Sequence, residues 1–198
     1  MRPLLALLTS FSLANGLVAQ DHQPLEKARK AAQLIHQKAS TLKDAQIEIK
    51  VDLDKPYLVT GSDNLGALVI PDKKLENKTQ PPFGDKPIAI GQLWMRGLAP
   101  VVDGDKVPRE KLRVIRIATD DENVELTGYL LAAVIRENSP TLLVYGNAKK
   151  PIAWLKLKKA KTLQELPLEL DAIGENGSAT LYFNLVGHYI AEMTIAAK

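Results

Sequence analysis

The sequence predicts a mainly β protein: an antiparallel β-sandwich of immunoglobulin-like architecture, preceded by one N-terminal α-helix, with a closed barrel as the alternative. Three observations support this fold class. Apolar and polar residues alternate over many short segments, turn-forming residues separate these segments, and no helical pattern lies between them. This combination is typical of sandwiches and barrels. With 198 residues, the chain is long enough to bury one core.

Residues 1–19 have the pattern of a secretory signal peptide. A positive charge at Arg2 precedes a short apolar stretch that begins at Leu4, and the small Ala19 marks the expected cleavage position. Polar residues interrupt this stretch, which is also shorter than the roughly 20 residues that a membrane-spanning helix needs. We therefore expect a secreted or periplasmic protein with no membrane insertion after cleavage. The chain contains no cysteine, which favours a bacterial source.

Residues 20–44 are expected to form a helical N-terminal segment. Pro24 suits the first helical turn, where a missing N–H group costs nothing. The apolar residues that follow recur at spacings of three and four, which places them on one stripe of a helix. They are Leu25, Ala28, Ala32, Ile35, Ala39 and Leu42. Because the stripe is short and half alanine, we expect a monomer whose helix leans on the domain or acts as a spacer; helix-mediated assembly is the alternative.

Residues 45–198 are expected to form a single β-sandwich domain. The alternation of apolar and polar residues over 45–53 predicts a half-buried first strand. Residues 129–135 are apolar on both faces, so we expect a central strand whose second face is covered by the helix or a loop. Further strands are expected at 57–60, 66–70, 87–96, 111–118, 124–135, 141–146, 152–159, 166–172, 180–185 and 188–195.

Two connections between these strands are informative. Asp103-Gly104 predicts a tight hairpin turn, because this pair tolerates the positive φ that such turns require. A calcium loop is the alternative at this position, but a third oxygen ligand and a distal glutamate are missing. Residues 71–86 are the one long stretch without periodicity. Long loops in compact domains are often functional, so we expect variation and contact there.

The sequence offers no motif for catalysis, metal binding or a cofactor. No serine stands in a G-x-S-x-G elbow, and His22 and His36 precede the β domain, while His188 is expected to be an exposed strand residue. Acidic residues 120–122 are expected to form a solvated loop, and no phosphate-binding glycine loop is present. We therefore expect no enzymatic activity. Carboxylates that act together in a small secreted hydrolase remain the alternative.

One candidate binding face emerges from the strand periodicity. Gln92, Trp94 and Arg96 share one side of a predicted strand, and Trp154 and Lys156 share one side of another. Exposed aromatic rings beside polar groups commonly grip sugar rings or peptides. The competing interpretation is that each tryptophan closes the edge of the core, with its N–H bonded to backbone, or lies under the helix or the long loop. The low aromatic content of 5% favours the competing interpretation.

Together these features predict an exported, non-catalytic protein with a binding or structural role. Its partner would be an unknown protein or glycan. The net charge of +3 is small and cations do not cluster along the sequence, which argues against nucleic acid. A carbohydrate- or peptide-binding module that uses the tryptophans is the more specific alternative.

Overall fold

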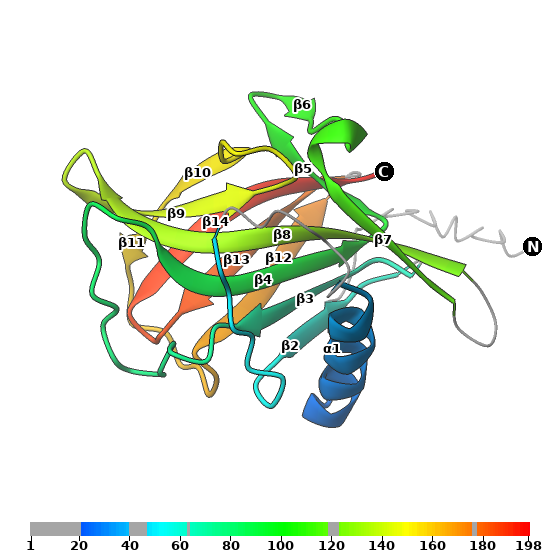
Figure 1. Ribbon diagram of the computed structural model, residues 1–198, viewed down its shortest axis with the longest axis horizontal. Helices are drawn as coiled ribbons and strands as arrows, with labels where there is room; N and C mark the ends of the chain where they lie inside the picture. Colours follow the sequence, from blue (N-terminus) through cyan, green and yellow to red (C-terminus); the bar gives the residue numbers. More distant parts are fainter. Residues whose placement is uncertain (1–20, 40–46, 63, 119–122, 176–177) are drawn as a thin grey trace, which may run out of the picture.

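The computed structural model describes residues 21–39, 47–62, 64–118, 123–175 and 178–198, and its domain is a sandwich of two antiparallel sheets (Figure 1). The sheets do not close into a barrel, so the predicted sandwich is confirmed. The expected signal peptide at 1–19 lies outside the described residues. Among those residues, no helix is long and apolar enough to cross a membrane.

The larger sheet has eight strands in the order β1-β2-β3-β4-β8-β9-β10, with β7 paired to β8. The long strand β8 pairs with β4 along one side and with β7 and then β9 along the other. The bounds are β1 (Asp21–His22), β2 (Tyr57–Thr60), β3 (Gly66–Pro71), β4 (Ile88–Arg96), β7 (Arg113–Ala118), β8 (Asn123–Arg136), β9 (Ser139–Tyr145) and β10 (Ala153–Lys156).

The smaller sheet has six strands in the order β12-β13-β14-β5-β6, with β11 paired to β14. The bounds are β5 (Leu98–Val102), β6 (Asp105–Lys106), β11 (Lys158–Lys159), β12 (Leu168–Glu175), β13 (Ser178–Leu185) and β14 (Tyr189–Ala197). One turn of 3₁₀ helix, η1 (Arg109–Lys111), precedes β7. With eight and six strands, both sheets are wider than the four and three strands of an immunoglobulin constant domain.

The chain passes between the sheets three times: once through η1, from β6 to β7, and at two positions directly from one strand to the next. Gly97, at φ 67°, separates β4 from β5 and lets the backbone turn from the larger sheet to the smaller one. The predicted Asp103-Gly104 turn then joins β5 to β6, with φ values of 53° and 89°. At the second position, the buried Leu157 separates β10 from β11. A single extended stretch, 153–159, therefore runs along the side of both sheets.

The main core lies between the sheets and is built by the inward residues of each alternating strand. Leu93 and Tyr129 form a cross-strand pair in the larger sheet, and Leu170 and Phe183 form another in the smaller sheet. All four are almost completely buried. A side-chain period of two explains why the sequence pattern located these strands within one to three residues.

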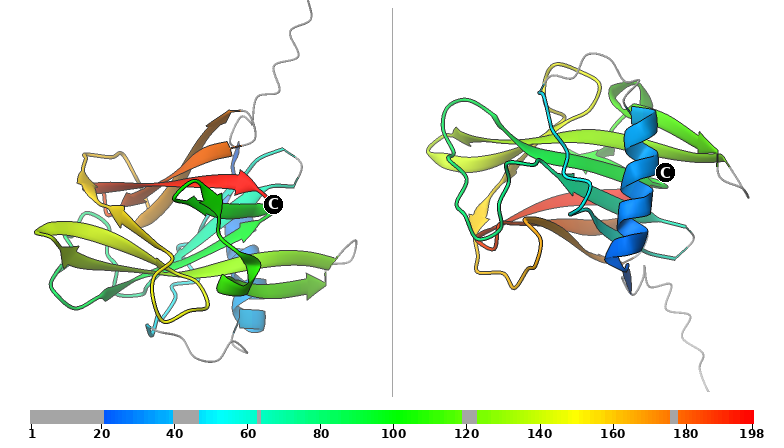
Figure 2. Two further views of the ribbon diagram at one scale, coloured as in Figure 1. Left: turned by 90° about the horizontal axis from the view of Figure 1, so that it is seen from above. Right: turned by 60° about the horizontal axis from the view of Figure 1, so that its bottom comes forward.

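Helix α1 (Leu25–Ala39) lies across the outer face of the larger sheet (Figure 2). Its buried residues are Ala28, Ala32 and Ile35, all from the predicted stripe, and they pack on outward residues of β3, β4 and β7. The alanines allow the helix to approach the strands closely. The expectation of a helix that leans on the domain is therefore correct; Leu42 lies outside the described residues.

The predicted first strand at 45–53 is wrong. Of its described part, only Val51 forms a bridge, with Asp72, and no strand is present. The backbone is held instead by the loop that follows β3, because the Asp72 carboxylate accepts a hydrogen bond of 2.8 Å from the Lys50 N–H group. The alternating pattern has another cause: Ile47 and Ile49 pack on the outer face of the larger sheet. They cover the second apolar face of β8, as predicted for a loop.

Candidate functional site

The five residues of the predicted binding face all lie on the outer face of the larger sheet, but the face is interrupted. Register pairs Gln92 with Leu130 and Trp94 with Gly128. In β10, Trp154 pairs with the outward Leu143. Helix α1 covers the first part of this face, leaving Trp94 4% exposed and Trp154 48% exposed. The exposed face therefore does not include Trp94.

Trp94 is a packing residue. Its ring lies flat against Gly128 of the neighbouring strand, where a Cβ atom would come within 2.5 Å of the ring. The indole Nε1–H donates a hydrogen bond of 3.0 Å to the Gln92 Oε1 atom. Gln92 thus satisfies the buried indole, in place of the backbone partner that the competing interpretation expected. The other half of that interpretation, a tryptophan lying under the helix, is correct here.

Trp154 presents its ring to solvent near the end of the same sheet. The guanidinium carbon of Arg136 lies 5.4 Å from the centre of the ring, which is a cation–π distance. Arg136 also forms an ion pair of 3.5 Å with Glu137. Lys156 is exposed on the same side of β10. The result is a half-exposed aromatic ring held by one cation and flanked by another.

At one end of the sandwich, β11, the β13–β14 turn and the long loop 72–87 come together (Figure 1). Residues of these segments line a groove of about 710 Å³. We call it the lysine groove. Three lysines and one histidine line it, and the residues that line it include no carboxylate. The lining residues are Lys78, Gln80, Lys159, Ala160, Lys161, Thr162, Leu163, Gln164, Gly187, His188 and Tyr189.

Buried Gln164 fixes one wall of the lysine groove. Its Oε1 atom accepts hydrogen bonds from the Gly187 N–H group at 2.7 Å and from the Thr162 hydroxyl at 2.8 Å. Its Nε2 group donates to the Leu166 carbonyl. The Ala160 N–H group adds a bond of 2.9 Å to the His188 carbonyl. The connection between β11 and β12 is thereby fixed against the β13–β14 turn.

Asn77 holds the long loop 72–87, which carries Lys78, against the connection between β11 and β12. Its Nδ2 group donates to the Gln164 carbonyl at 3.2 Å and to the Glu165 carbonyl at 2.9 Å. The next residue, Lys78, has φ 62° and donates its N–H group to the Val186 carbonyl at 3.1 Å, while Val186 has φ 50°. A branched residue at positive φ is strained, and such strain persists only where surrounding contacts determine the backbone. Asn77 therefore has a structural role, because it holds the long loop against the residues that precede β12.

The lysine groove was not predicted from the sequence. The 71–86 loop was expected to make contacts, and it supplies Lys78 and Gln80 to the groove. His188 is exposed as expected, but it lies in the turn before β14, and its Nε2 atom is 3.2 Å from the Lys78 carbonyl. The three lysines come from two separate stretches of chain, Lys78 from the long loop and Lys159 and Lys161 from β11 and the residues after it, so the sequence alone does not show that they meet.

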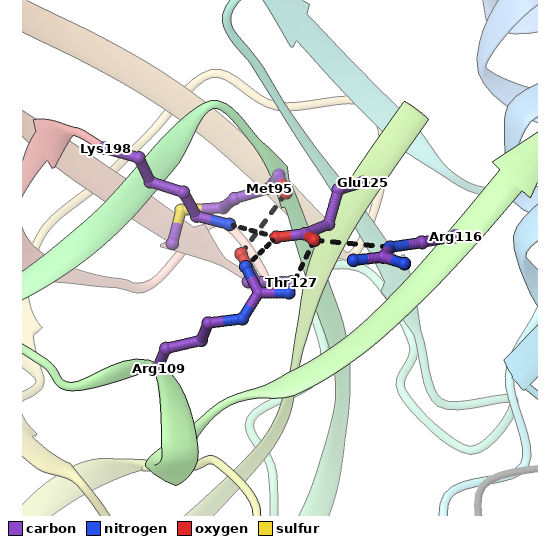
Figure 3. Close-up of polar contacts among 6 residues, drawn as sticks. All are labelled: Met95, Arg109, Arg116, Glu125, Thr127 and Lys198. Carbon is purple, nitrogen blue, oxygen red and sulfur yellow. Dashed lines mark hydrogen bonds and ion pairs between the residues drawn. The ribbon is translucent and has the colours of Figure 1, made fainter. Parts of the chain in front are cut away.

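A second charged cluster lies at the opposite end of β14, and in this cluster the cations surround a carboxylate (Figure 3). The Glu125 carboxylate accepts two hydrogen bonds of 2.6 Å from Arg109, and Arg116 and Lys198 each lie 3.6 Å away. The hydrogen bond from Arg109 holds the pKa of Glu125 below its ordinary value. This carboxylate joins η1, β7, β8 and the last residue of the chain, which is a structural use of charge.

No group of three or more histidine, cysteine, aspartate or glutamate side chains that could hold a metal ion occurs in the part of the chain that the structure describes. The acidic residues at 120–122 lie outside that part. Comparisons with protein-family models, with curated proteins and with solved structures give no match for this chain.

Proposed function

We propose that the protein is an exported, non-catalytic binding protein that holds a carbohydrate through the surface around Trp154. The observation that carries this proposal is the contrast between the two tryptophans, one packed under α1 and the other half exposed beside Arg136. An exposed indole has a flat apolar face that suits the C–H face of a sugar ring, and nearby cations supply hydrogen-bond donors for its hydroxyl groups. The secretory pattern at 1–19 supports a partner outside the cell.

A carbohydrate fits this surface better than a peptide does. Peptides that add to a sheet need a free strand edge of several residues. β10 has only four residues, and it pairs with β9 along its other edge. The chain then leaves for the smaller sheet. A short edge that ends in this way is blunted against strand addition, so contact must come from side chains. Arg136 limits rotation of the ring, which reduces the ordering cost of binding.

The test is a titration of the mature protein with chito-, cello- and uronic-acid oligosaccharides, followed by tryptophan fluorescence and calorimetry. Binding should change the emission of Trp154, and Trp154→Ala should weaken the affinity measured by calorimetry about tenfold, the order of one lost stacking contact. Ile173→Ala is the matched control, because Ile173 is an exposed apolar residue on the other sheet, at 68% exposure. If no oligosaccharide binds, or if Trp154→Ala binds as well as the control, the proposal is wrong.

A further inference from the structure

We infer that the carbohydrate is acidic, and that its carboxylate or sulfate groups lie in the lysine groove. This inference rests on the proposed function and names the ligand class of that site. The groove and Trp154 are joined by the stretch 153–159, which places Lys159 about 17 Å along the chain from Trp154 at the rise of an extended strand. Contact with both the ring and the groove requires an oligosaccharide long enough to span this separation.

The charge of the groove is uncompensated within the described residues. Lys158 forms an ion pair of 2.8 Å with Glu192 on the outer side of the smaller sheet. Its neighbour Lys159 instead lines the groove with Lys161 and Lys78, and none of these three lies within ion-pair distance of a described carboxylate. A concave surface lined by one sign of charge focuses its field and concentrates ions of the opposite sign. The occupant that complements this surface is an anion.

The groove is also preorganised. The hydrogen bonds of Gln164 and Asn77 fix the two walls that carry Lys161 and Lys78, so an anion meets cations whose backbone positions are already set. Thr162 and Gln80 add neutral polar groups to the lining. A mixture of cations and neutral polar groups on a rigid concave wall suits an acidic glycan, which presents hydroxyl groups as well as charges.

Two other anionic partners fit the groove less well. A membrane surface is broad, so it binds cations that project from a convex or flat surface, whereas these lysines line a hollow. Insertion into the membrane also needs several apolar side chains, and the rim of the groove has one exposed apolar side chain, Leu163. Nucleic acid is gripped by several stacking aromatics, whereas the lining contains only the buried Tyr189. Both partners are outcomes of the test.

The test compares matched probes in calorimetry over a range of salt concentrations: oligogalacturonate and its methyl ester, and dextran sulfate and dextran. The variant K78Q/K159Q/K161Q should weaken binding of at least one acidic probe about tenfold or more, with a weaker salt dependence, and should leave the neutral probes unchanged. The control K30Q/K73Q/K111Q removes the same charge from exposed positions outside the groove and should bind as the wild type does.

The outcomes separate the two proposals. If Trp154→Ala abolishes glycan binding while the groove variant binds normally, the acidic-ligand inference is overturned and the proposed function stands. If the groove variant loses acidic glycan while Trp154→Ala does not, the proposed role of Trp154 fails and the groove remains an anion site. Tighter binding of phosphatidylglycerol vesicles or a single-stranded oligonucleotide through the same lysines would overturn the assignment to glycan. Absence of binding to all four probes would overturn the inference as well.

Discussion

Replacing each tryptophan by alanine tests the assignment of Trp94 to packing and of Trp154 to the surface. A buried tryptophan removes about 150–250 Å² from water, worth about 4–6 kcal/mol as an upper estimate. Trp94 is 4% exposed, so Trp94→Ala should lower the free energy of unfolding by about 3–5 kcal/mol. Trp154 is 48% exposed, which halves the area, and Trp154→Ala should cost about 2–3 kcal/mol including its contact with Arg136.

Urea denaturation followed by circular dichroism measures both variants, because this signal does not depend on the tryptophans. Thermal midpoints should fall by at least about 6 °C for Trp94→Ala and by about half as much for Trp154→Ala. The reasoning would be refuted if Trp154→Ala cost as much as Trp94→Ala. That result would make Trp154 a core residue and would turn any loss of ligand binding into a loss of folding.

Three further predictions follow from contacts of single residues. Gly128→Ala should destabilise the fold by about 1–3 kcal/mol because its Cβ atom would lie 2.5 Å from the Trp94 ring, and denaturation should show this cost largely disappearing in the Trp94→Ala background. Gln164→Leu should lower the free energy of unfolding by about 1–3 kcal/mol, because the buried Gly187 N–H group loses its acceptor. Hydrogen exchange at the Gly187 amide should also accelerate, and an unchanged exchange rate would contradict the role of Gln164. Glu125→Gln should be less stable than the wild type above about pH 4.5, and the difference should vanish on acidification. The reason is that the pKa of Glu125 is lowered in the folded state, so its stabilising contribution is lost as the carboxylate protonates. Equal urea midpoints of the two proteins at neutral pH would refute this.

The sandwich was predictable because alternation with a period of two reports burial on one side of a strand, whatever the strand order. The same reasoning failed at 45–53, where the alternating residues Ile47 and Ile49 lie on a segment that packs over the sheet. Periodicity shows which side of an extended chain is buried, but not whether its backbone groups pair in a ladder. That segment bonds to the Asp72 carboxylate and to the backbone groups of Pro71 and Lys73, which no local pattern can reveal.

The candidate site was predictable only where one strand carried it. Trp154 and Lys156 are two residues apart on β10, so their shared face could be read from the sequence. The burial of Trp94 could not be read from the sequence, because it depends on where α1 crosses the sheet. The lysine groove depends on three distant stretches of chain that meet through Asn77 and Gln164, so its charge appears only in the folded protein.

The two ends of β14 show why the net charge of the chain does not describe its local charge. At the C-terminal end of β14, Glu125 forms ion pairs with Arg109, Arg116 and Lys198, so the charge of these cations is opposed by a carboxylate. At its N-terminal end, beside Tyr189, the groove has no carboxylate in its lining, and its cations face a hollow. A net charge of +3 averages these two arrangements. Because local field depends on whether a counter-charge is within a few ångströms, the modest total is compatible with one strongly basic groove.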